Sequence, residues 1–104
     1  MTDAGRNFRV AAVLRVQSGD GRASVAERRA AFANEGVAEG ARALVAKVAK
    51  NAWKVTDEDV AAAKAAGVTE DQLFELTVCA AMGQATRQLD AALAALDEAT
   101  KETP

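Results

Sequence analysis

The stretch VTEDQLFELTVCAAMGQATRQLD, residues 68–90, decides the fold because it predicts one long helix. Thr69 is placed to accept a hydrogen bond from the first helical turn, and Gln72 three residues later completes a capping-box pattern. The two acidic residues between them suit the positive end of a helix dipole. The residues that follow are mostly alanine, leucine and other helix formers, so we expect a helix from Glu70 to about Ala99.

The first half of this helix is apolar on both sides. At 100° per residue, one broad stripe is expected to face the core, and it comprises Phe74, Val78, Ala81, Met82, Ala85, Leu89, Ala92, Leu93 and Leu96. A second apolar group lies on the other side and comprises Leu73, Leu76, Ala80 and Gly83. A helix that is apolar nearly all round is either central in its domain or buried against a partner. We therefore interpret the second group as a surface for self-association.

Upstream of this stretch, the sequence predicts shorter helices separated by clear breaks. The sequence SGDGR, residues 18–22, favours a turn because two glycines flank an aspartate. Ser24 and Glu27 form another capping-box pattern, and Gly67 suits a left-handed helix stop. The expected helices are Val25–Asn34, Val37–Lys54 and Asp57–Ala66, while Phe8–Gln17 suits either a short helix or an extended segment.

These elements indicate an all-α chain that folds as a single domain over residues 1–104. A chain of this length, half of it apolar, can bury one core without metal or disulfide support. We expect a compact bundle of four or five helices, with Met1–Gly5 and Thr100–Pro104 as flexible tails. Much of the apolar content is alanine, which buries little area per residue, so an oligomer would add useful buried surface.

Composition and charge exclude several classes of protein. A single cysteine excludes an internal disulfide, and no apolar run approaches the roughly 20 residues that span a bilayer. No signal-peptide pattern is found, so we expect a soluble, cytoplasmic protein with no membrane partner. Residues 1–54 carry ten basic and five acidic residues, whereas residues 55–104 carry three basic and ten acidic ones. Because the basic residues are spread over several segments, we expect no nucleic-acid binding, but complementary packing between the two halves, within or between chains.

The absence of histidine removes much of the catalytic repertoire. Ser–His and Cys–His nucleophile pairs and His-ligated zinc are excluded, and one cysteine cannot hold a metal alone. Asp57, Glu58 and Asp59 are adjacent in a predicted first helical turn, where capping explains them. No glycine-rich nucleotide-binding loop occurs. We therefore predict neither a cofactor nor a metal.

Cys79 is the one residue with the potential to act as a nucleophile. A reactive thiol needs a cation, a helix N-terminus or a second cysteine close by. Cys79 stands about ten residues into the long helix, between Val78 and Ala80. Free cysteine in such surroundings behaves as a small hydrophobic residue. We interpret Cys79 as a packing residue, with a redox or nucleophilic role as the alternative.

The segment KVAKNAWKVTDEDVAAAKAAGVTEDQLFELTVCAAMGQATRQLDAALAAL, Lys47–Leu96, resembles the C-terminal part of the carboxymuconolactone decarboxylase / alkylhydroperoxidase D-like superfamily. The features that carry the resemblance are a capped short helix, the sequence AAGVTEDQLFEL and a long alanine-rich helix. The resemblance covers about half of the chain and implies an all-helical fold that assembles as a trimer or hexamer. For the peroxidase members it also implies a C-x-x-C motif followed by a histidine, with a glutamate and another histidine as a proton relay.

That peroxidase site cannot be carried over to this chain. If Cys79 matched one cysteine, Met82 would stand at the second and Thr86 at the histidine. In the family the C-x-x-C helix precedes a G-[ST]-x-[DE]-[DEQ] helix start, whereas here GVTEDQ precedes Cys79. The resemblance therefore implies a small oligomeric protein without the redox site, in a structural or binding role. Two alternatives remain: a thiol-dependent peroxidase or lyase-like enzyme that uses Cys79 or unidentified residues, and a binder of small apolar ligands.

Overall fold

The computed structural model describes residues 3–101, with side chains from Arg9 onward. This part of the chain contains five α-helices, one short 3₁₀ turn and no strand, which confirms the all-α prediction. The elements are α1 (Asp3–Ser18), α2 (Val25–Ala33), α3 (Glu39–Asn51), η1 (Ala52–Lys54), α4 (Asp57–Ala65) and α5 (Glu70–Lys101). The segment 8–17 is helical, and so are residues 3–5 and 100–101 of the expected tails. Met1, Thr2 and residues 102–104 of those tails lie outside the described residues.

The starts of α2, α4 and α5 follow the capping patterns in the sequence. In α2, the Ser24 hydroxyl accepts from the Glu27 N–H at 3.0 Å, and the Glu27 carboxylate accepts from the Ser24 N–H at 2.9 Å. Each such pair satisfies two backbone donors that a helix start would otherwise leave free. The three reciprocal pairs are Ser24–Glu27, Thr56–Asp59 and Thr69–Gln72.

Residues with left-handed backbone end α2 and separate α4 from α5. Asn34 caps α2 at φ 52°, and Gly67 follows α4 at φ 98°, as the sequence predicts for a left-handed stop. Helix α3 ends at Asn51, three residues before the expected end, because the chain continues as the 3₁₀ turn η1. Trp53 lies in this tighter turn and is 79% exposed.

The hydrophobic core lies where α2 and α3 pack on the first half of α5. Its buried side chains are mostly small, as an alanine-rich composition predicts, and Val45 and Cys79 are the largest that are fully enclosed. The buried cluster comprises Ala23, Ala31, Val37, Ala41, Leu44, Val45, Val48, Ala63, Leu73, Leu76, Cys79 and Ala80.

The face of α5 that enters this core is the opposite of the expected one. Phe74, assigned to the core stripe, is 70% exposed, and Leu96 is 62% exposed. Leu73 and Leu76 are buried instead. The reason lies at Gly83, where a Cβ atom would overlap the backbone carbonyl of Phe32 in α2. Only the face that carries glycine and small side chains lets α2 approach so closely, so that face is the buried one.

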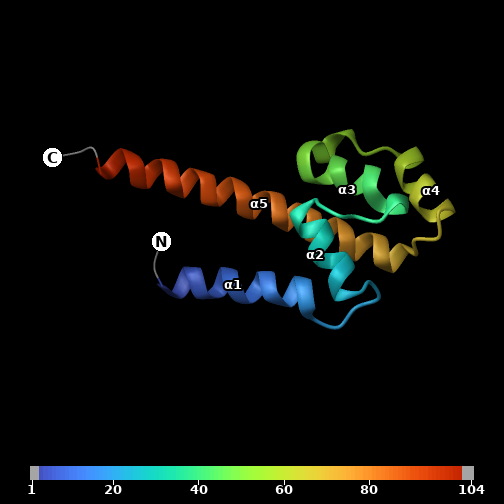
Figure 1. The fold of residues 1–104 in the computed structure, drawn as a ribbon, viewed down its shortest axis with the longest axis horizontal. Helices are drawn as coiled ribbons and strands as arrows, with labels where there is room; N and C mark the ends of the chain where they lie inside the picture. The colour runs from blue at the N-terminus through green and yellow to red at the C-terminus, as the bar shows by residue number, and fades with distance from the viewer. Residues whose placement is uncertain (1–2, 102–104) are drawn as a thin grey trace.

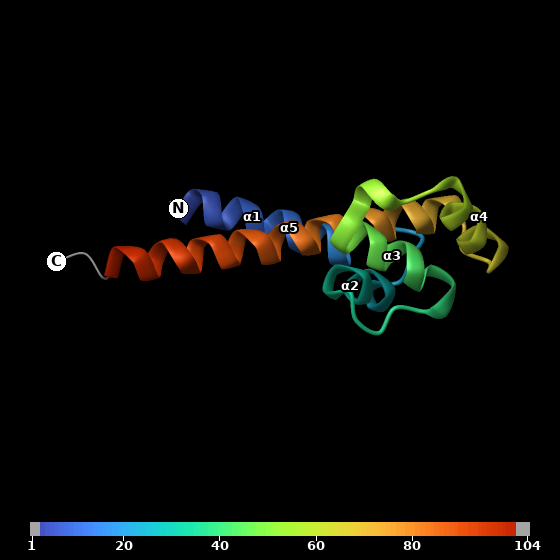
Figure 2. The ribbon, with the colours of Figure 1, turned by 90° about the horizontal axis from the view of Figure 1, so that it is seen from above.

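Two helices project from the core and give the protein an elongated shape. The molecule measures 58 × 28 × 20 Å, and its radius of gyration is 15.9 Å, against about 13 Å for a compact domain of this length. Helix α1 runs antiparallel to α5 and lies beside its outer part (Figures 1 and 2). We call α1 together with residues 84–101 of α5 the arm. An ion pair of 2.8 Å between Arg9 and Asp90 links its two helices.

Ion pairs also join the basic and acidic halves of the sequence within one chain. Arg9 pairs with Asp90, and Lys47 pairs with Asp59 at 2.8 Å. Both pairs link a base from residues 1–54 to an acid from residues 55–104. In the described part of the chain, each helix is too short or too polar to span a lipid bilayer.

Candidate functional site

Cys79 lies at the junction of α1, α2 and α5 and is fully buried. Its thiol donates to the backbone carbonyl of Val16 at 3.5 Å, and Arg28 Nη1 donates to the same oxygen at 3.3 Å. Val16 is in the last turn of α1, where backbone carbonyls have no partner within the helix. Cys79 and Arg28 therefore hold the C-terminal end of α1 against the core.

The environment of Cys79 favours the neutral thiol over the thiolate. Burial raises the pKa of the Cys79 thiol, the charge of Arg28 lowers it and the charge of Glu75 raises it, and the result is a pKa above the usual value of 9.0. A nucleophilic thiol needs the opposite shift and access for its substrate. Met82, the residue at the second C-x-x-C position, lines a groove against α1 together with Thr86. Cys79 is therefore a buried thiol that packs in the core and donates a hydrogen bond to Val16, not an activated nucleophile.

Glu75 fastens the loop between α1 and α2 to α5. Its two carboxylate oxygens accept from the backbone N–H groups of Arg22 at 2.8 Å and Ala23 at 2.6 Å. Burial raises the pKa of Glu75, but these two hydrogen bonds and the charge of Arg28 outweigh it, so the pKa lies below its usual value of 4.5. No sequence pattern indicates this contact, because Glu75 and its partners are 52 residues or more apart.

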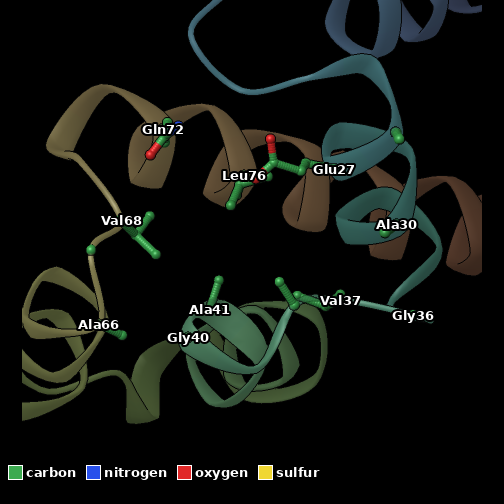
Figure 3. A pocket seen from close by; sticks show the side chains of 13 residues that line it. Glu27, Ala30, Gly36, Val37, Gly40, Ala41, Ala66, Val68, Gln72 and Leu76 are labelled. Atoms are coloured by element: carbon green, nitrogen blue, oxygen red, sulfur yellow. The ribbon is translucent and has the colours of Figure 1, made fainter.

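A cleft of about 440 Å³ lies between α2, α3 and the turn from α4 to α5 (Figure 3). Its volume is within the range of small-molecule sites. The side chains of Val37, Val68 and Leu76 point into it, and alanines and glycines form most of the remaining wall. Its polar residues, Glu27 and Gln72, are engaged in the capping boxes of α2 and α5. The cleft can hold a small apolar group, but its polar residues are already hydrogen-bonded.

The four residues predicted to mediate self-association lie inside the protomer. Leu73, Leu76 and Ala80 are buried in the same cluster as the side chains of α3, and Gly83 is buried against α2. The helices of the same chain cover this face, which corrects the expectation that it forms an outer surface. The physical reason is the close approach of Phe32 to Gly83, which fixes the register of α2 on α5.

Exposed apolar side chains lie on both helices of the arm, in addition to Trp53 and Phe74 outside it. Val10 is 49% and Leu14 is 53% exposed on α1, and they lie one turn apart on one side of it. On α5, Leu89, Leu93 and Leu96 recur at steps of four and three, and Leu96 is 62% exposed. A groove of about 270 Å³ runs between the helices, with Val13, Met82 and Leu89 among its lining residues. The leucine spacing is visible in the sequence, but it suits a core-facing stripe equally well, so spacing alone does not predict that these residues lie on the arm.

Among residues 9–101, no group of three or more cysteine, aspartate or glutamate side chains is placed to hold a metal ion. No family model, no curated protein and no solved structure matches this chain.

Proposed function

We propose that this protein is a self-associating helical protein without thiol-redox chemistry, and that two copies pair through their arms. The observation that carries the proposal is the apolar row that each arm helix leaves uncovered. Val10 and Leu14 on α1 and Leu96 on outer α5 are exposed, and Leu93, one turn before Leu96, is half-buried. An exposed apolar patch bordered by charged residues is typical of a protein interface.

Charge favours a second copy of this chain as the occupant. Helix α1 carries three arginines and one aspartate, whereas residues 84–101 of α5 carry three acidic and two basic residues. A two-fold axis through the arms would lay α1 of each copy on α5 of the other, so that opposite charges meet twice. Within one chain, the Arg9–Asp90 ion pair already joins a base of α1 to an acid of α5.

The dimensions of the arm suit a dimer interface. Each arm helix is about 25 Å long, and two side by side present a face about 20 Å wide. With side-chain relief, this face approaches the roughly 800 Å² per partner of a standard interface. The alanines of outer α5, from Ala91 to Ala95, would let the helices of two copies approach closely.

We also propose that the chain is a non-redox relative of the alkylhydroperoxidase D-like proteins. The capped helix α4, the left-handed Gly67 and the long α5 are the elements on which the resemblance rests, and they support the proposal. The buried, high-pKa Cys79 supports the absence of peroxidase chemistry. The resemblance implies a protein that assembles into oligomers, and pairing through the arms would produce such an oligomer.

Light scattering coupled to size-exclusion chromatography tests the pairing. The double variant Leu14→Ser/Leu96→Ser removes two exposed leucines from the arm without touching the buried cluster. We expect it to weaken association at least about tenfold, because each leucine contributes one to a few kcal/mol when buried. The matched control is Trp53→Ser, which removes a larger exposed apolar side chain from η1. An equal effect of both variants, or no effect of the double variant, would contradict the role of the arm.

A second candidate function is the binding of a small apolar molecule in the cleft of Figure 3. The volume of about 440 Å³ and its alanine- and valine-rich wall favour it. Cyclohexanol is a suitable probe, and we expect it to raise the melting temperature of the wild type. Ala66→Leu would fill the cleft from its rim and remove this stabilisation. A ligand effect that persists in Ala66→Leu would place the binding elsewhere.

A further inference from the structure

Arg28 in α2 is the one buried charged residue in the described part of the chain, with 5% of its surface exposed. Its Nη1 donates to the Val16 carbonyl at 3.3 Å. Its Nε is enclosed without a hydrogen-bond partner. Arg28 forms no ion pair with any side chain between Arg9 and Lys101. The charge of Arg28 therefore has no directly paired carboxylate, although it interacts with the nearby Glu75 and lowers the pKa of that side chain.

This is an unusual state for a guanidinium group. Removing a charge from water is costly unless hydrogen bonds and an opposite charge replace the lost hydration. One long hydrogen bond to a carbonyl replaces only a small part of it. The carboxylate of Glu75 is nearby, but it accepts from backbone N–H groups of the α1–α2 loop and forms no direct ion pair with Arg28. A buried polar group without a partner calls for a specific explanation, such as a bound ligand or ion.

Arg28 also lines a pocket that is separate from the cleft of Figure 3. This pocket has a volume of about 220 Å³ and lies between the C-terminal end of α1 and α5. Val16, Phe74 and Val78 supply its apolar walls. Phe74 is 70% exposed, so most of its surface is not covered by the chain. The lining of this small pocket therefore includes both a buried guanidinium group, from Arg28, and an exposed aromatic ring, from Phe74.

We propose that this pocket binds a small monocarboxylate with an apolar body, its carboxylate directed at Arg28 and its body against Phe74 and Val78. The planar guanidinium matches a carboxylate in shape and in charge. The volume admits a molecule the size of benzoate. Arg15, Asp20 and Glu75 also line the pocket, so its two arginines and two carboxylates carry no net charge. The pocket therefore lacks the excess of positive charge that a dianion such as phosphate requires.

Titration of the full-length, ¹⁵N-labelled chain with benzoate, followed by NMR, tests the proposal. We expect saturable shifts of the Arg28 side-chain Nε–H and of the Phe74 and Val78 amides, with a Kd of about 1 mM or tighter. Benzamide has the same shape without the charge, so it should bind at least about tenfold more weakly. Inorganic phosphate should produce no saturable shift at these residues.

Single-residue variants distinguish the loss of benzoate binding from a loss of the folded structure. Arg28→Gln should abolish the benzoate response, while Arg29→Gln, an exposed arginine next to it, should leave it unchanged. Arg28→Gln also loosens α1, so Phe74→Ser supplies a variant that removes an exposed wall without touching the core. We expect Phe74→Ser to weaken benzoate binding several-fold. The proposal is overturned by equal binding of benzamide, by shifts centred on Val37 and Val68 in the other cleft, or by no saturation at about 10 mM.

Discussion

Gly83 of α5 lies against the backbone carbonyl of Phe32 in α2, so closely that a Cβ atom would overlap it. One turn further along α5, Arg87 Nη1 donates to the same carbonyl at 2.7 Å. The two contacts fix where α2 crosses α5, because one requires the absence of a side chain and the other supplies a charged donor. The crossing point in turn decides which face of α5 is buried and which residues the arm leaves exposed.

Gly83→Ala should therefore destabilise the protein severely. The added methyl group meets backbone, which cannot move aside as a flexible side chain can, so we expect a loss of about 2–4 kcal/mol in the free energy of unfolding. Gly40→Ala is the matched control. Its methyl group would meet the Ala66 Cβ at 3.0 Å, and alanine favours the helix, so we expect a change within about 1 kcal/mol. Urea unfolding followed by circular dichroism measures both, and equal effects would contradict the close approach.

Local features of the fold were predictable from the sequence, whereas the packing faces were not. The three capping boxes and the left-handed Gly67 involve residues close together in the chain, so their patterns can be read directly. The buried face of α5 depends on Phe32, about 50 residues away, and both faces of that helix are apolar. The spacing of apolar residues along α5 therefore does not predict which of its two faces is buried. For the same reason the sequence predicts the leucines of outer α5 to face the core, whereas the core does not extend that far.

Cys79 should be unreactive in the folded protein. The thiol is fully buried and its pKa is raised by burial, so alkylation requires opening of the structure. We expect iodoacetamide to react at pH 8 at least about 100-fold more slowly with the native chain than with the chain in guanidinium chloride. Peroxide consumption by the wild type should not exceed that of Cys79→Ala. A fast native reaction, or peroxide turnover lost in the variant, would support the enzyme alternative.

The same thiol should make stability depend on pH at the alkaline end. Because its pKa is higher in the folded state than the usual 9.0, the unfolded chain releases the proton first as the pH rises. The contribution of Cys79 is therefore complete below about pH 8 and is lost above pH 9. Cys79→Ala should lose about 1–2 kcal/mol of stability at neutral pH and show a smaller decline between pH 8 and 10. Melting temperatures of the two proteins across this range measure the difference, and parallel curves would contradict it.

Glu75 should contribute to stability at neutral pH and lose that contribution in acid. Its pKa is lower in the folded state than the usual 4.5, so the unfolded chain takes up the proton first as the pH falls. Glu75→Gln weakens two hydrogen bonds to the α1–α2 loop, and we expect it to cost about 1 kcal/mol at pH 7. The two proteins should converge in stability as the pH falls through 4.5 and below. A difference that stays constant down to pH 3 would show that the charge of Glu75 is not responsible.

The pairing of arms is the central claim, and the mass of the wild-type protein in solution tests it most directly. One chain has a mass of 10.8 kDa. Sedimentation equilibrium at micromolar concentrations should give at least twice this mass and a shift toward the single chain on dilution, because exposed apolar rows on both arm helices become buried when two copies meet. A mass of 10.8 kDa that is independent of concentration up to about 100 μM would contradict the account.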